Sequence, residues 1–398
     1  KNSQPTQRLL RPRPDRTTIQ DWSYDAQRDA LNPALSAAQC DLAFPHHSRE
    51  LERAAGWYAS RNLTIRAEDV ALDKHDSKVF RMFIHDNQLR VLEAKRTWGD
   101  FWGPRAVFFF QLFERALLGA AALGEKLPSV EFSMFIDDRP NMPSSDAAPK
   151  DTHLMWGSNR NFNAPQDERV WLLPDFEYWK GPAASSWDEM QRRAWQHDAP
   201  FTSKIPKVLW RGVKHTNRRL RGPLLDVTKD QEWADVVEVD WARRENFVDL
   251  DDHCRYAFLV HTEGVAWSGR IKYLWNCDSL LFIHDLYWDF HLAALLVPDG
   301  PHQNYVPVRR DFADLEEKVQ YYLAHPDDAQ RIIRNSVNTF RPYTSMAAQA
   351  CYLRQMIRTY STMAFQPEIS ETVSVDVSGQ SLTKIVTRGQ PFAEWLYV

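Results

Sequence analysis

The sequence has no long apolar run. None of its hydrophobic segments approaches the roughly 20 residues that a membrane-spanning helix needs. Three common enzyme motifs are also missing: the Walker phosphate loop, the G-x-S-x-G elbow and the H-E-x-x-H helix. Internal repeats and low-complexity tracts are absent too. The chemistry of the protein must therefore be sought in less familiar segments.

Cysteine is scarce, and the four cysteines form no CxxC pair. They stand far apart, at Cys40, Cys254, Cys277 and Cys351. The 13 histidines are scattered, with His46 and His47 as an isolated pair that suits a surface turn. We therefore expect no metal site, and either two disulfides or four buried thiols.

Charge of one sign is not in excess either. The 398 residues include 49 basic and 53 acidic side chains, for a net charge of -4. This balance gives no electrostatic footprint for nucleic acid, so we expect no nucleic-acid partner. Hydrophobic residues make up 43% and charged residues 26% of the chain, which is typical of a folded protein. The length of 398 residues suggests two or three domains. Tryptophan is abundant, at 16 residues, and we expect most of these rings in the core.

After Pro206, strand-like and helix-like segments alternate, which predicts a parallel, doubly wound α/β sheet. The expected strands are 207–212, 235–241, 256–262, 279–284 and 304–310. The expected helices are 217–228, 271–275, 314–326, 326–340 and 344–363. Before Pro206, helices are expected at 34–44, 48–62 and 106–127, and strand-like segments at 78–94 and 129–141. Residues 142–206 are expected to form long functional loops with a helix near 186–196, and the tail to return to β structure.

The segment 263–282 reads "EGVAWSGRIKYLWNCDSLLF" and connects an expected strand to a helix. In open α/β sheets, ligands bind outside the carboxyl ends of the strands. Arg270 lies in the first turn of the expected helix, where a cation opposes the macrodipole unless an anion is bound. We therefore expect a phosphate or diphosphate here, although a tight turn alone would also need glycine. The candidate residues are Gly264, Val265, Ala266, Ser268, Gly269 and Arg270.

A second glycine-containing turn lies at 210–222, "WRGVKHTNRRLRG", with Gly212 and a cluster of basic residues. Any one of these arginines could instead lie on a solvated basic face and bind no ligand. Two such turns at the same end of one sheet could clamp a diphosphate without a metal, because guanidinium groups bind phosphate in a bidentate fork.

Two acidic segments are further candidates. Asp137 and Asp138 end an expected strand, where a carboxylate could act as a general base or could simply form a turn. The segment "DLDD" at 249–252 could hold a metal-bound nucleotide, but we favour a helix cap.

Several segments resemble the capsule-associated protein and protein O-glucosyltransferase (Rumi-like) glycosyltransferase family, and we expect a fungal capsule-type member. The resemblance extends from about residue 207 to residue 360 and, more thinly, over 129–182. It is carried by "VLWRGV", "DDHCRYAFLVHTEGVAWSGRIKYLWNCDSLLF", "NYVPVRRDFADLEEKVQYYL", "FIDDRP" and "FEYWKGP". It implies a GT-B fold with two Rossmann-like lobes. The expected divisions are an acceptor-side lobe at 1–205, a UDP-sugar lobe at 206–345 and a returning helix and tail at 346–398.

The resemblance also implies roles for individual residues. The family's catalytic aspartate falls on Asp138, and its two diphosphate-binding arginines fall on Arg219 and Arg270. The acceptor side would include Asp137 and Trp179. Cys254 and Cys277 flank a strand and the following helix, so their sulfurs could meet. The resemblance implies this pairing, Cys254–Cys277, together with Cys40–Cys351.

The function that the resemblance implies is an inverting, metal-independent transfer of xylose or glucose from a UDP-sugar to a glycan or glycoprotein, and we favour xylose. One alternative is an inactive secretory protein that binds sugar or UDP with the same fold. Another is a dehydrogenase-like enzyme, which the missing G-x-G-x-x-G turn disfavours. The basic, proline-bearing start without Met and the sequon at Asn62 suggest a lumenal Golgi or endoplasmic-reticulum protein. We expect a type II membrane protein whose anchor has been removed.

Overall fold

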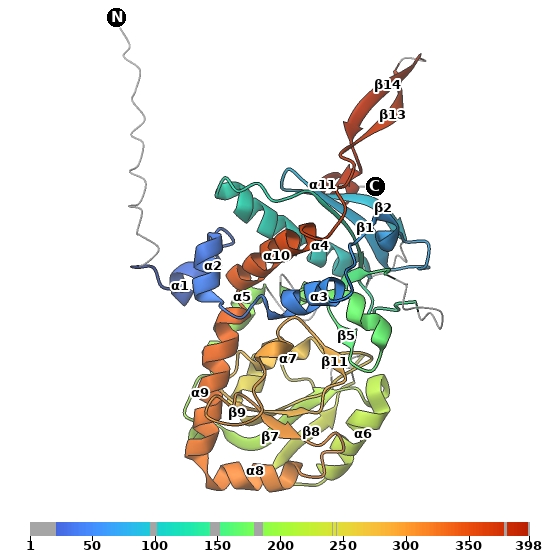
Figure 1. The fold of residues 1–398 in the computed structure, drawn as a ribbon. Helices are drawn as coiled ribbons and strands as arrows, with labels where there is room; N and C mark the ends of the chain where they lie inside the picture. Colours follow the sequence, from blue (N-terminus) through green and yellow to red (C-terminus); the bar gives the residue numbers. More distant parts are fainter. Residues whose placement is uncertain are drawn as a thin grey trace, which may run out of the picture.

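The structure, a computed structural model, describes residues 21–95, 102–143, 152–178, 186–240, 242–243, 245–377 and 380–396. Two β-sheets organise these residues, and in Figure 1 the six-stranded sheet lies above the five-stranded sheet. Two smaller two-stranded sheets are also present. The protein is therefore a mixed α/β protein, as the alternation of strand-like and helix-like segments predicted.

The five-stranded sheet is parallel throughout, with the strand order β12-β10-β9-β7-β8. Its strands are β7 (Ile205–Gly212), β8 (Ala234–Glu238), β9 (Tyr256–His261), β10 (Leu280–His284) and β12 (Val306–Val308). The helices of this half are α6 (Arg218–Val227), α7 (Arg270–Leu274), α8 (Leu315–Ala324) and α9 (Pro326–Tyr343). All five residues of β10 are buried, as expected for a strand covered on both faces. The predicted parallel sheet is confirmed here.

The six-stranded sheet is mixed, with the order β15-β2-β1-β3-β4-β6. Its strands are β1 (Val79–His85), β2 (Gln88–Lys95), β3 (Val130–Phe135), β4 (Met155–Gly157), β6 (Val170–Leu172) and β15 (Gln390–Pro391). Of these, β3, β4 and β6 run parallel, whereas β1 pairs antiparallel with both β2 and β3. Parallel pairing therefore extends through the whole five-stranded sheet, and in the six-stranded sheet it is confined to these three strands.

Two local features differ from the sequence-based expectation. The strand-like segment 78–94 is a hairpin, turned at Asp86 and Asn87, whose φ angles are 50° and 55°. Both residues tolerate this left-handed conformation, which tight hairpin turns require. The region 142–206, expected to be loops and one helix, also contributes β4 and β6 to the sheet. Each of these strands has three residues, too few to show an alternating pattern.

The chain returns to the six-stranded sheet at its end. From α9, the helix α10 (Met346–Ser361) packs against α4 (Trp102–Ala122), and β15 pairs with β2 (Figure 1). The hairpin of β13 (Ser370–Val377) and β14 (Gln380–Thr387) projects from this half. The remaining α-helices are α1 (Ala26–Asp29), α2 (Ala37–Ala43), α3 (Arg49–Ala59), α5 (Trp187–Trp195) and α11 (Phe392–Trp395).

The core joins the two sheets. One continuous cluster of buried apolar side chains includes Phe132 of β3 and Leu259 of β9. Trp156 stacks on Phe132 with ring centroids 3.8 Å apart. Five tryptophans are among the largest fully buried side chains: Trp156, Trp171, Trp187, Trp210 and Trp275. The expectation that tryptophan serves mainly the core holds for these five.

Both disulfides expected from the resemblance are present. Cys40 on α2 is bonded to Cys351 on α10, and Cys254 is bonded to Cys277 after α7.

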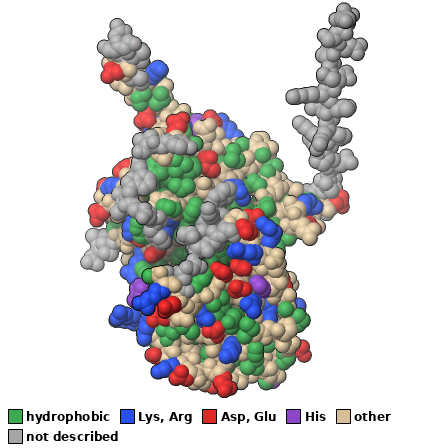
Figure 2. All heavy atoms as spheres, turned by 180° about the vertical axis from the view of Figure 1, so that it is seen from behind, with side chains coloured by type: hydrophobic (Ala, Val, Ile, Leu, Met, Phe, Trp, Pro, Cys, Tyr) green, Lys and Arg blue, Asp and Glu red, His purple; other side chains and the backbone are tan. Residues whose placement is uncertain are grey.

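The expected glycosylation sequon begins at Asn62, which is exposed and has a φ of 52°, just after α3. Within the described ranges, no helix is long and apolar enough to cross a membrane. On the face shown in Figure 2, basic and acidic side chains are interspersed.

Candidate functional site

Two adjacent cavities lie at the carboxyl ends of the parallel strands, between the two sheets. The smaller has a volume of about 320 Å³ and the larger about 850 Å³. Thr216, Gly264 and Val265 line both cavities, so the cavities share a wall. This position is the one where open α/β sheets bind ligands.

Asp138 lines the smaller cavity and follows β3. Its Oδ1 accepts a hydrogen bond of 2.8 Å from Nη1 of Arg105, a residue of α4. The Arg105 guanidinium also lies 4.6 Å from the ring centroid of Trp102 and 4.7 Å from that of Phe176. Because Arg105 is fixed by these contacts, it orients the carboxylate. The Asp138 side chain is 42% exposed, so it remains accessible to a ligand.

Asp137 lines the same cavity, but its carboxylate is used by the protein itself. Its Oδ2 accepts a 2.9 Å hydrogen bond from Lys78, and its Oδ1 accepts a 2.7 Å bond from the backbone amide of Asp138. Asp137 therefore shapes the turn that presents Asp138. Trp179, the other acceptor-side residue expected from the resemblance, lies outside the described residues.

Arg270 lies where the sequence placed it, as the first residue of α7, and lines the smaller cavity together with Ser268 and Gly269. Its Nη1 donates to the backbone carbonyl of Arg211. Because α7 has only five residues, its macrodipole is weak. The positive charge of this wall therefore comes mainly from arginine side chains.

Arg221 lines the smaller cavity together with Arg105 and Arg270, and sequence analysis did not single it out. It is 5% exposed, and its guanidinium donates to the carbonyls of Glu263 at 3.1 Å and Val213 at 2.9 Å. Among the described residues, no carboxylate pairs with it. Burial, and then the charge of Arg270, lowers the pKa of Arg221. Two guanidinium groups therefore share a poorly solvated wall, and a bound anion would relieve their repulsion.

Arg219, the second arginine expected from the resemblance, lines the larger of the two adjacent cavities, whereas Arg270 lines the smaller one. It is exposed on the wall of the larger cavity, whereas Arg221 shares the smaller cavity with Arg270. Helical spacing is the reason: Arg221 stands three residues before the buried Leu224 and faces inward with it. That spacing is the signal in the sequence that could have identified Arg221.

Two of the glycines expected at the site, Gly264 and Gly212, have different roles. A Cβ on Gly264 would lie 3.3 Å from Nη2 of Arg221, so glycine leaves room for the guanidinium. A Cβ on Gly212 would lie 2.6 Å from the ring of Trp210, and Gly212 lines neither cavity. Gly212 therefore permits core packing, whereas Gly264 belongs to the cavity wall.

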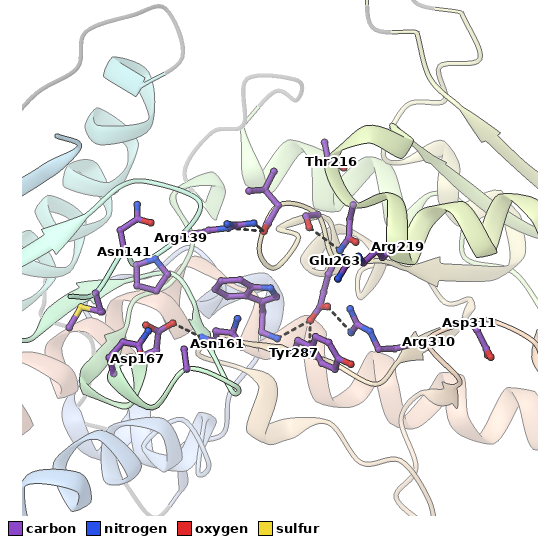
Figure 3. Close-up of a pocket in the computed structure, with 18 residues that line it drawn as sticks. Arg139, Asn141, Asn161, Asp167, Thr216, Arg219, Glu263, Tyr287, Arg310 and Asp311 are labelled. Carbon is purple, nitrogen blue, oxygen red and sulfur yellow. Dashed lines mark hydrogen bonds and ion pairs between the residues drawn. The ribbon is translucent and has the colours of Figure 1, made fainter. Parts of the chain in front are cut away.

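The two halves of the protein meet at the shared wall. Arg139 follows Asp138 and donates to the carbonyl of Val265 from Nε at 3.2 Å and from Nη2 at 3.1 Å (Figure 3). Asp175, which follows β6 and lines the smaller cavity, forms an ion pair with the buried Lys272 of α7. These contacts hold the loops after β3 and β6 against the loop after β9. Ala266 in that loop is buried.

The acidic segment 249–252 lies beside basic side chains of the protein. Asp251 lies 3.4 Å from Arg193, and Asp252 lies 3.8 Å from Arg255. Asp251 precedes a short 3-10 helix (Asp252–Arg255), but its side chain makes no capping hydrogen bond. The segment therefore stands at the start of a short helix, as the favoured prediction required, with Asp251 at the N-cap position but without a side-chain capping bond. Within the described ranges, no group of three or more His, Cys, Asp or Glu side chains could hold a metal ion.

Comparison with known proteins places the chain in a family. Residues 37–391 match the model of glycosyl transferase family 90. Human protein O-glucosyltransferase 1 is 26% identical over 262 residues, which are 59% of this chain and 63% of that protein. The O-glucosyltransferase rumi homolog of Anopheles gambiae is 27% identical over 211 residues, 48% of this chain and 52% of that protein. The matches thus span about half to just under two thirds of these relatives' length. Because the family model covers most of the sequence, the chain belongs to glycosyl transferase family 90.

Proposed function

We propose that this protein is a glycosyltransferase that moves a sugar from a UDP-sugar to a hydroxyl group of a glycan or glycoprotein. The observation that carries the proposal is the content of the smaller cavity: one oriented, accessible carboxylate, Asp138, faces a wall that holds Arg221 and Arg270. An accessible carboxylate and arginine side chains in one cavity suit a reaction that removes a proton and releases a diphosphate.

The proposed reaction is a single displacement. Asp138 takes the proton of the acceptor hydroxyl while the acceptor oxygen attacks C1 of the donor sugar. The bond between C1 and the UDP oxygen breaks, and UDP leaves with the bonding electron pair. Arg221 and Arg270 stabilise the negative charge that develops on the diphosphate. Attack from the face opposite to UDP inverts the configuration at C1.

Glucose is the donor sugar that the comparisons support. Both relatives described above are named O-glucosyltransferases, whereas no feature of the structure supports the expected preference for xylose.

We propose a GT-B arrangement for the two sheets, with the donor on the half that contains the parallel sheet. Its proposed divisions are 1–205, 206–345 and 346–398. The two disulfides support an oxidising compartment such as the lumen of the endoplasmic reticulum or Golgi.

Turnover of UDP-sugars tests this proposal. UDP-glucose, UDP-xylose and UDP-galactose are each incubated with the protein, and release of UDP is followed with and without an acceptor, in buffer containing a chelator. We expect UDP release from UDP-glucose without added metal, because the two arginines neutralise the diphosphate. UDP binding without any turnover would favour the alternative of an inactive binding protein. Strict dependence on manganese or magnesium would contradict the metal-independent mechanism.

A further inference from the structure

We propose that the larger cavity binds the acceptor, and that this acceptor is a saccharide chain and not a loop of a folded protein. This inference rests on the proposed glycosyl transfer at the smaller cavity. It concerns residues that the proposed chemistry does not use.

The position of the larger cavity suits an acceptor. It shares Thr216, Gly264 and Val265 with the smaller cavity, and Arg139, the neighbour of Asp138, lies on its wall. Val265, which lines both cavities, accepts the two hydrogen bonds from Arg139 (Figure 3). Arg139 is exposed and directly follows Asp138 in the chain, so the larger cavity lies next to the proposed base.

The walls of the larger cavity carry groups that bind hydroxyls. In Figure 3, Asn141, Asn161 and Asp167 lie on one wall, and Tyr287 and Arg310 on the opposite wall. Glu263 on that opposite wall already accepts hydrogen bonds from Arg310 and from the backbone amides of Tyr287 and Trp288. Side-chain amides both donate and accept hydrogen bonds, and carboxylates accept several, as the many hydroxyls of a sugar require. The volume of about 850 Å³ falls within the range of pockets that enclose small organic ligands.

Asp167 is the most specific of these groups. Its residue is 4% exposed, and its Oδ2 accepts a 2.9 Å hydrogen bond from the backbone amide of Asn161. Among the described residues, no second donor reaches this carboxylate. A buried carboxylate with spare acceptor capacity at a cavity wall is costly unless a ligand donates to it. The neighbouring Gln166 also lines the cavity, and the structure gives its side-chain amide no hydrogen bond within the described ranges.

Aromatic side chains complete the site. Tyr287 is 46% exposed, and the guanidinium of Arg310 lies 3.5 Å from its ring centroid. Arg310 is fixed by a 2.9 Å hydrogen bond to Oε2 of the buried Glu263, so it holds the tyrosine in place. Trp288 lines the cavity beside it. Such rings offer flat apolar surface next to polar groups, which matches the C–H faces and hydroxyls of a pyranose.

The same walls fit a protein loop poorly. Of the eighteen described residues that line the cavity, four have aliphatic side chains: Pro140, Met142, Ala164 and Val265. Protein recognition normally depends on apolar anchors buried in the centre of the interface. Most of the other side chains that line this cavity are polar or charged, so a saccharide is the better match.

The test compares acceptors and variants. Transfer from the UDP-sugar is measured with maltotriose, xylotriose and mannotriose and with a small folded disulfide-rich domain that exposes serine. Binding of each trisaccharide in the presence of UDP is measured by calorimetry. The variants are Asp167→Asn, which keeps an oxygen for the Asn161 amide, and Gln166→Ala. Asp299→Asn, at an exposed carboxylate that lines neither cavity, is the matched control.

We expect at least one trisaccharide to be an acceptor. Asp167→Asn should raise its KM or dissociation constant about tenfold or more and leave UDP affinity unchanged, and Asp299→Asn should change neither. Transfer to the protein domain alone, or weaker UDP binding in Asp167→Asn, would overturn the inference. If the wild type releases no UDP from any donor, the proposed function fails. Trisaccharide binding that depends on Asp167 would then still support the saccharide site. If no trisaccharide binds, the saccharide site is refuted.

Discussion

At the scale of single residues, Arg105 determines the position of the Asp138 carboxylate. Asp138 follows a strand, and its hydrogen bond with Arg105 holds the carboxylate at the smaller cavity. The two residues are 33 positions apart in the sequence and meet because α4 packs beside β3. Asp137, one residue earlier, faces Lys78 and supports the turn. Two adjacent and chemically identical side chains thus have different surroundings.

Replacement of Asp138 tests its role as the base. We expect Asp138→Asn to retain UDP affinity but to lower kcat about 10²–10⁴-fold, because the amide cannot take the acceptor proton. Asp137→Asn is the matched variant and should lose much less activity, since its carboxylate supports the turn. Steady-state kinetics and UDP titration separate the two effects. Near-normal turnover of Asp138→Asn would move the base elsewhere.

The arginines show what the sequence could and could not predict. Arg270 was found because a cation in the first turn of a helix needs an anion, an argument that uses neighbouring residues only. Choosing among the arginines of "NRRLRG" required knowing which face of α6 is buried. Arg221 lies inward with Leu220 and Leu224, whereas Arg218 and Arg219 are exposed. The packing of α6 against the sheet decides this, and it involves residues distant in the sequence.

At the scale of elements, a small antiparallel sheet connects the two halves. It consists of β5 (Arg160–Asn161) and β11 (Trp288–Asp289). Arg160 donates to Asp289 at 2.5 Å and to Glu168 at 2.8 Å. Arg53 on α3 joins the same network through Glu168 and through the buried Glu50. These two-residue strands have no signature in the sequence, because pairing across the halves creates them.

Glu50 should make the stability of this network depend on pH. Burial raises the pKa of Glu50 to about 7 despite its ion pair with Arg53. The folded state therefore holds a proton that the unfolded state releases above its ordinary pKa near 4.5. The stabilisation is fully present below that value and is lost as the pH rises through about 7, at about 1.4 kcal/mol per unit of pKa difference.

The measurement is the free energy of unfolding of wild type and Glu50→Gln between pH 5 and pH 8. We expect the difference, wild type minus variant, to fall as the pH rises. Glu52→Gln, on the exposed side of the same helix, should show no such trend. A difference that stays constant or increases with pH would show that Glu50 is ionised throughout this range.

At the scale of the whole molecule, the Cys40–Cys351 disulfide fastens the start of the described chain to the helix that returns from the parallel sheet. The two cysteines are 311 residues apart, against 23 for Cys254 and Cys277. The order of strands and helices in the parallel half was predictable, because each element there has its own apolar run. The mixed pairing of the other sheet was not predictable, because β15 pairs with β2 although their residues are about 300 positions apart in the sequence.

Removal of each disulfide gives a test at this scale. We expect Cys40→Ser with Cys351→Ser to destabilise the protein by roughly 2 kcal/mol more than Cys254→Ser with Cys277→Ser, because a longer closed loop restricts the unfolded chain more. Denaturant unfolding of both double variants measures the difference, after non-reducing peptide mapping has verified the pairings. Equal losses, or a larger loss for the shorter loop, would count against the loop-entropy explanation.

The central claim is that Arg221 and Arg270 form the diphosphate site opposite Asp138. Calorimetric titration of UDP into the wild type, Arg270→Ala, Arg221→Lys and Arg219→Ala tests it most directly, with melting temperatures as a check of folding. We expect Arg270→Ala to lose about 1.5–3 kcal/mol of binding free energy, and Arg221→Lys to lose affinity because the bidentate fork is gone. Arg219→Ala should bind UDP nearly as the wild type does. Unchanged affinity in both Arg270→Ala and Arg221→Lys, or the largest loss in Arg219→Ala, would contradict the account.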